Sequence, residues 1–103
     1  MVISTHVLDT AAGRPAAGVP VTLEIQAGNG WKKLRDAVTD SDGRVRDLHQ
    51  GAAAGVYRIT FDLGARSSFY PHATVEFRVA DPSQHYHVPL LLSGYGYVTY
   101  RGS

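Results

Sequence analysis

Apolar and polar residues alternate along three segments of the chain, and this period of two constrains the fold more than any other feature. In residues 19–26 (VPVTLEIQ) every second side chain is valine, leucine or isoleucine, and residues 56–63 and 72–79 repeat the pattern. Such a period puts apolar side chains on one face of a β-strand and polar side chains on the other. The pattern therefore predicts strands that each cover a core with one face.

Weaker strand signals occupy much of the remaining chain. We expect further strands at 2–8, 31–38, 44–48, 86–93 and 95–101. Turn-forming segments separate the strands, at 11–18, 27–30, 40–43 and 80–83. No segment shows a sustained helical period. Seven or eight short strands with regular turns predict an all-β antiparallel sandwich.

Size and charge narrow the classes of protein. A chain of 103 residues has room for one core, so we expect a single domain over residues 1–103. Ten basic and nine acidic residues are scattered without a basic stripe, which argues against a nucleic-acid partner. The sequence lacks cysteine, a signal-peptide pattern and an apolar run of about 20 residues. We therefore expect a cytoplasmic protein with no membrane partner.

The facing of the end strands places histidines outside the core. In the first strand Ile3, Thr5 and Val7 suit the core, so that Ser4, His6 and Leu8 face outward. In the strand near the other end the core face is apolar, and the outward set is His85, His87, Pro89 and Leu91. If these strands are neighbours, one outer face carries imidazoles among Leu8, Leu91, Val98 and Tyr100. Such a face predicts a homo-oligomer with a ligand site or subunit interface there.

Two long motifs resemble a known family. THVLDTAAGRPAAGVPVTLE (5–24) and HYHVPLLLSGYGYVTYRGS (85–103) resemble the two signature segments of the transthyretin-related proteins. YRGS (100–103) is similar to the ending of the 5-hydroxyisourate hydrolase branch. The segments GNGW, TDSDGR and YRITFD fit the family in order, so the resemblance covers essentially the whole chain.

The resemblance implies a fold, an assembly and an activity. It implies a transthyretin-like sandwich of two four-stranded sheets, assembled as a homotetramer with active sites at the dimer–dimer interface. Members with these motifs hydrolyse 5-hydroxyisourate, a product of urate oxidation, to 2-oxo-4-hydroxy-4-carboxy-5-ureidoimidazoline, without a cofactor. The motif positions assign catalysis to His6, His87 and Ser103, and substrate binding to Arg44, Tyr100, Arg101 and Gly102.

The sequence departs from the family pattern away from these positions. Gly94 and Val98 stand where proline and serine are more usual, and His72 stands where an acidic residue is common. The segment 63–71 is shorter than its family counterpart, which carries a short helix. We therefore do not expect that helix in this chain.

The implied residue types suit the opening of a cyclic amide. The reaction needs a base for water, a donor for the developing oxyanion and an acid for the leaving nitrogen. An unperturbed imidazole titrates near neutrality, so two histidines can supply the base and the acid, and Arg44 offers a permanently charged fork of donors. Ser103 could orient water or an imidazole. The sequence leaves open which histidine is the base.

Other interpretations of the same residues predict different proteins. A transthyretin-like carrier of a small aromatic ligand would use the same channel without catalysis. His6, His85 and His87 together could bind zinc, although no cysteine or acidic motif supports them. DSDG (40–43) lacks the acidic residues of a calcium loop, so we expect a turn that presents Arg44. We expect structural roles for His49, His72, Tyr95 and Tyr97, and a structural or supporting role for His85.

Overall fold

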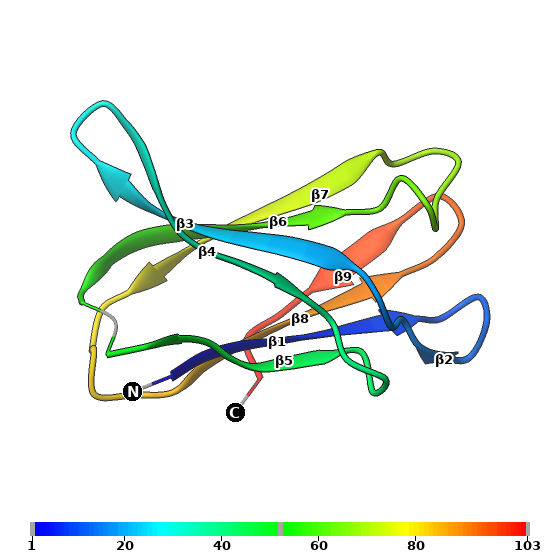
Figure 1. The fold of residues 1–103 in the computed structure, drawn as a ribbon, viewed down its shortest axis with the longest axis horizontal. Helices are drawn as coiled ribbons and strands as arrows, with labels where there is room; N and C mark the ends of the chain where they lie inside the picture. The colour runs from blue at the N-terminus through cyan, green and yellow to red at the C-terminus, as the bar shows by residue number, and fades with distance from the viewer. Residues whose placement is uncertain (1, 52, 103) are drawn as a thin grey trace.

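Nine strands form two sheets in the computed structural model, which describes residues 2–51 and 53–102 (Figure 1). β1 lies inside the first sheet, with β8 and then β9 on one side and both β5 and the short β2 on the other. The second sheet has the order β4-β3-β6-β7. The strands are β1 (Val2–Asp9), β2 (Arg14–Pro15), β3 (Pro20–Ala27), β4 (Gly30–Val38), β5 (Arg44–Gln50), β6 (Gly55–Asp62), β7 (His72–Val79), β8 (Tyr86–Leu92) and β9 (Tyr97–Thr99).

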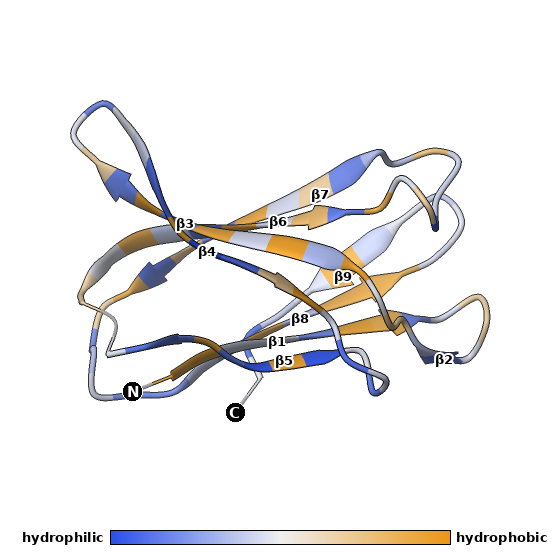
Figure 2. Ribbon diagram, viewed as in Figure 1, coloured by the Kyte–Doolittle hydropathy of each residue, from blue (hydrophilic) through white to orange (hydrophobic). Residues whose placement is uncertain are grey.

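The core lies between the two sheets, where the alternation placed it. Figure 2 shows apolar and polar residues alternating along β3, and Val21 and Leu23 on this strand are buried. The register sets Leu23 beside Ile59 of β6, which in turn pairs with Val75 of β7. Burial of these side chains is the main favourable term in folding. The predicted all-β sandwich is confirmed.

One pair of neighbouring strands departs from the antiparallel pattern. β1 and β8 lie side by side and run parallel (Figure 1), whereas the other strand pairs within the described residues are antiparallel. The first sheet is therefore mixed. The parallel register pairs Ser4 with His87 and His6 with Pro89, which brings motifs from opposite ends of the sequence together.

The first sheet also has five strands in place of the predicted four. The additional strand, β2, is two residues long, and it pairs with Leu8 and Asp9 of β1, beyond the point where β5 begins at Arg44 opposite His6. The strand expected at 95–101 shortens to Tyr97–Thr99. The segment 63–71 consists of turns, as expected, and no helix occurs among residues 2–51 and 53–102. Accordingly, the described residues offer no helix that is long and apolar enough to cross a membrane.

Candidate active site

A shallow hollow lies on the outer face of the five-stranded sheet. Its volume is about 220 Å³, and side chains of β5, β1 and β8 line it together with the residue before β8. The lining residues are Ser4, Thr5, Arg44, Arg46, His85 and His87. Thr5 itself points toward the core and donates a hydrogen bond from Oγ1 to the carbonyl oxygen of Val88 at 2.7 Å. This hydrogen bond ties β1 to β8 beneath the hollow.

Strand register aligns the sequence-predicted residues across this face. His6 of β1 stands opposite Arg44 of β5 on one side and Pro89 of β8 on the other. Ser4 stands opposite His87. Because adjacent strands lie about 4.8 Å apart, side chains in these rows are close neighbours. The structure thus brings His6, Arg44 and His87 together on the outer face, as the facing of the strands predicted.

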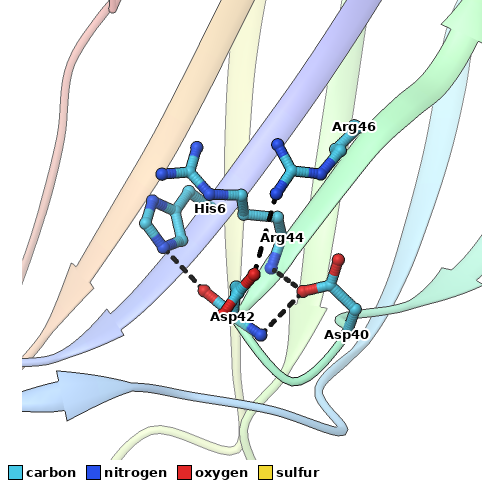
Figure 3. Close-up of polar contacts among 5 residues, drawn as sticks. All are labelled: His6, Asp40, Asp42, Arg44 and Arg46. Carbon is cyan, nitrogen blue, oxygen red and sulfur yellow. Dashed lines mark hydrogen bonds and ion pairs between the residues drawn. The ribbon is translucent and has the colours of Figure 1, made fainter.

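The turn before β5 holds Arg44 in place. The Asp40 carboxylate accepts hydrogen bonds from the backbone N–H groups of Asp42 (2.9 Å) and Arg44 (3.0 Å), as Figure 3 shows. These bonds, that of Arg44 first, lower the pKa of Asp40. The segment DSDG is therefore a turn that presents Arg44, as expected.

His6 is fixed by the same turn. Its Nε2 lies 2.8 Å from the carbonyl oxygen of Asp42, and Figure 3 shows this bond beside the side chain of Arg44. A carbonyl oxygen only accepts hydrogen bonds, so Nε2 carries the proton. The neutral ring then keeps a lone pair on Nδ1. His6 can therefore accept a hydrogen bond from water or from a substrate N–H.

His87 is half-buried at the opposite side of the hollow. Its Nδ1 lies 2.7 Å from Ser4 Oγ, and its backbone carbonyl accepts a hydrogen bond from the Gly102 N–H at 2.8 Å. Burial, and then repulsion by the positive charges that His6, Arg44 and His85 carry when protonated, lower the pKa of His87 below 6.5. The ring is therefore neutral at pH 7, as a general base requires.

Gly102 lies directly against the ring of His87. A Cβ atom added at Gly102 would come within 2.6 Å of His87 Cδ2 and 3.3 Å of its Cγ. Only a residue without a side chain fits there. Gly102 thus supports the site through its backbone and its small size, at a position that the family motif had assigned to substrate binding.

Tyr100 and Arg101 lie elsewhere in the single chain. They line a separate groove of about 250 Å³ between β7 and the core-side residues Tyr86 and Val88 of β8. The Arg101 guanidinium stacks on the Tyr86 ring, with Cζ 4.2 Å from the centroid. The expectation that Tyr100 shares the histidine face fails because β9 ends at Thr99, and beyond it the alternation no longer holds. Ser103 lies outside the described residues.

Four residues that line the hollow, Ser4, Thr5, Arg46 and His85, were not among the predicted catalytic or substrate-binding residues. Ser4 was expected to face outward and is only 5% exposed, because its hydroxyl contacts both His85 and His87. The sequence could have identified Ser4 as a site residue, because it precedes His6 by two positions and so shares a strand face with it. Arg46 follows Arg44 by two residues, and its Nη2 lies 3.7 Å from Asp42 Oδ2. It adds a second positive charge to the lining.

The remaining predicted residues do not gather here. His49 lies at the core side, with its ring centroid 6.4 Å from that of Tyr57, and His72 is exposed on β7. Within residues 2–51 and 53–102, no group of three or more His, Asp or Glu side chains is placed to hold a metal ion. The alternative of a three-histidine zinc site therefore gains no support from the geometry.

Comparisons with known proteins give a consistent set of relatives. Residues 3–102 match the HIUase/Transthyretin family. A 5-hydroxyisourate hydrolase of Salmonella dublin is 46% identical over 110 residues, which cover 99% of this chain and 81% of that protein. The structure of Klebsiella pneumoniae 5-hydroxyisourate hydrolase matches with a TM-score of 0.85 and 34% identity, covering 100% of both chains. Sea bream transthyretin in complex with thyroxine matches with a TM-score of 0.91 and 29% identity, over 99% of this chain and 95% of that one. The fold alone does not distinguish these relatives.

Proposed function

The chain belongs to the HIUase/Transthyretin family, and on this premise we propose that it opens the cyclic amide of 5-hydroxyisourate in the hollow on β1, β5 and β8. Its activity is the hydrolysis of 5-hydroxyisourate, since hydrolases of this name are 46% identical over 99% and 98% of the chain. The observation that carries the site is His87: a half-buried, neutral imidazole beside Arg44 and His6.

Arg44 suits the recognition of an oxygen-rich heterocycle. Its guanidinium is charged at every physiological pH and presents donors in a plane, which matches carbonyl oxygens and a developing oxyanion. Arg46 adds positive charge on the same side of the hollow. These two side chains would hold the ring and stabilise the negative charge that forms during attack.

The two histidines divide the proton chemistry between them. His87 Nε2 takes a proton from water while the water oxygen bonds to the amide carbonyl carbon, and His6 Nδ1 accepts a hydrogen bond that orients that water. Arg44 stabilises the oxyanion of the tetrahedral intermediate. The carbon–nitrogen bond then breaks, and the proton held by His87 goes to the leaving nitrogen. The product, 2-oxo-4-hydroxy-4-carboxy-5-ureidoimidazoline, leaves the step as the ring-opened carboxylic acid and then releases the second water proton to solvent as its carboxyl group ionises.

The carrier alternative rests on the same fold. Sea bream transthyretin, which matches this chain, is in complex with thyroxine. A carrier needs apolar walls and a few hydrogen-bonding groups, and a buried neutral imidazole beside two arginines serves no purpose in holding an apolar ligand. The residues of the hollow therefore favour hydrolysis.

Assembly would complete the site. The single-chain hollow is shallow, and the same sheet face carries Leu8, Leu91 and the exposed Val98 farther along β1, β8 and β9. We propose that four copies associate through this face, so that the hollow becomes a closed channel at the dimer–dimer interface. In the single chain Tyr100 and Arg101 lie outside the hollow, so they would contribute to the channel only in the assembled tetramer.

The test is the ultraviolet decay of freshly generated 5-hydroxyisourate with and without protein. We expect the wild-type protein to accelerate the decay, and His6→Ala and His87→Ala each to reduce kcat/KM about 100-fold, as loss of an acid–base group does. His72→Ala is the matched control, because His72 is exposed on β7 and should leave the rate unchanged. Wild-type rates in both His6→Ala and His87→Ala would discard the assignment.

A further inference from the structure

A buried serine hydroxyl joins two imidazoles beside the hollow. Ser4 Oγ lies 2.7 Å from His87 Nδ1 and 2.8 Å from His85 Nε2. The parallel register of β1 and β8 sets Ser4 opposite His87, while His85 lies two residues earlier and is exposed to solvent. The three side chains therefore form a hydrogen-bonded row along the wall of the hollow, with the half-buried His87 at one end and the exposed His85 at the other.

The chemistry of the hydroxyl gives this row a direction. A serine hydroxyl has one proton, so between two neutral imidazoles it donates to one nitrogen and accepts from the other. Within residues 2–51 and 53–102, His87 Nε2 has no hydrogen-bond partner, which leaves this nitrogen for the reaction. A neutral His87 that offers a lone pair at Nε2 must carry its proton on Nδ1.

We propose that Ser4 and His85 are positioning residues that form a proton relay behind His87, an inference that rests on the hydrolase function proposed above. In the resting state His87 Nδ1–H donates to Ser4 Oγ, and the Ser4 hydroxyl donates to His85 Nε2. The relay thus fixes the tautomer in which His87 is a base toward the hollow.

The relay also turns the base into an acid. When His87 Nε2 takes the water proton, the Nδ1 proton passes to Ser4 and the Ser4 proton passes to His85 Nε2. His87 is then neutral with its proton on Nε2, ready to donate to the leaving nitrogen, and the imidazolium charge rests on His85. Donation to that nitrogen reverses both transfers and restores the resting state, so every proton is accounted for.

The charges around His87 give a reason for the relay. A proton kept on His87 would be half-buried and would face His6 on β1 and Arg44 and Arg46 on β5. All of these groups are neutral or positive, and burial together with their charges lowers the pKa of His87. Moving the charge to the exposed His85 returns it to solvent, where hydration stabilises it.

The first test measures the tautomer directly, by ¹⁵N NMR of the histidine rings in the protein without substrate. We expect His87 to be protonated on Nδ1 in the wild type, to lose this preference in Ser4→Ala, and to regain it in Ser4→Thr, which restores the hydroxyl. We expect Ser4→Ala to lower kcat about tenfold, the effect of one net hydrogen bond, and Ser4→Thr to recover most of it.

The second test uses His85, whose exposure makes its replacement harmless to the core. We expect His85→Ala to lower kcat about tenfold at unchanged KM, because the Ser4 proton then has no acceptor. His72→Ala, an equally exposed site away from the hollow, should change neither value.

The outcomes separate the relay from the function on which it rests. An Nε2–H tautomer of His87 in the wild type would overturn the relay, as would equal losses in Ser4→Ala and Ser4→Thr, or full kcat in His85→Ala. A wild-type protein that shows the Nδ1–H tautomer but leaves 5-hydroxyisourate decay unchanged would instead refute the proposed function.

Discussion

His87 shows how strongly the chemistry of a single residue depends on its neighbours. An imidazole in water titrates near pH 6.5, yet here burial, and then repulsion by His6, Arg44 and His85 when they are protonated, lower the pKa of His87. The site is thus distinguished at residue scale by the surroundings of one imidazole rather than by the number of imidazoles.

The pH dependence of activity follows from this pKa. His87 works as the neutral base, so kcat/KM should be full above the lowered pKa and fall as the pH drops through it, with the midpoint below 6.5. High salt should move the midpoint upward, because salt screens the charges of His6, Arg44 and His85. It should stay below 6.5, because burial is the largest cause. A pH–rate profile at low and high salt measures this, and a midpoint above 6.5 would contradict it.

Gly102 offers a second prediction at residue scale. In Gly102→Ala the new Cβ would lie 2.6 Å from His87 Cδ2, so the ring must move. We expect kcat/KM to fall about 10- to 100-fold, since misplacing a reacting group by about 1 Å has effects of this size. Gly94→Ala is the control, because no atom lies within 4 Å of its added Cβ. Equal activity of the two variants in the decay assay would rule out this role for Gly102.

At the scale of elements, the turn between β4 and β5 links stability to the site. Gly43 has φ 75°, and a Cβ there would meet the Val7 carbonyl oxygen at 2.5 Å. The Gly43 carbonyl in turn accepts a hydrogen bond from the Val7 N–H at 2.7 Å. The backbone of this turn is therefore locked to β1, directly beside His6.

Replacing Gly43 should therefore cost more than backbone strain alone. An alanine with positive φ costs about 1–2 kcal/mol, and in Gly43→Ala the clash with Val7 adds to that figure and displaces Arg44. Gly13→Ala is matched, since Gly13 has φ 72° with open space around the added Cβ. Urea unfolding should show the larger loss for Gly43→Ala, and only this variant should lose activity. Equal free energies of unfolding for Gly43→Ala and Gly13→Ala would show that the close contact with Val7 does not affect stability.

The sequence predicts the strands themselves better than the way they pair, because strand patterns are local and pairing is not. Alternation is local, so it identified the strands, the core and the outward facing of His6 and His87. Pairing is not local, and nothing in the period indicated that β1 and β8 run parallel or that Ser4 meets two imidazoles. In β5 the irregular register turns both Val45 and Leu48 inward, against a strict period of two. The placement of Tyr100 and Arg101 was missed because the chain leaves the sheet after Thr99.

At the scale of the whole molecule, the outer face of the five-stranded sheet is where assembly and catalysis would meet. Val98 is 60% exposed and stands opposite Leu91, beside the strand that carries His87. Exposed apolar side chains on a sheet face suit a surface that pairs with a copy of itself. In the predicted assembly, residues of this face would both bind the neighbouring copies and enclose the substrate.

Light scattering should accordingly give a mass about four times the 11.1 kDa of the chain. Val98→Lys should lower that mass and reduce kcat/KM together, because a lysine ammonium in an apolar interface loses its hydration. Val38→Lys is the matched control: Val38 is also 60% exposed but lies on β4, in the other sheet. It should keep both mass and activity. A wild-type protein that is monomeric and fully active at micromolar concentration would show that one chain encloses its own substrate, and the assembly proposed for this face would then be wrong.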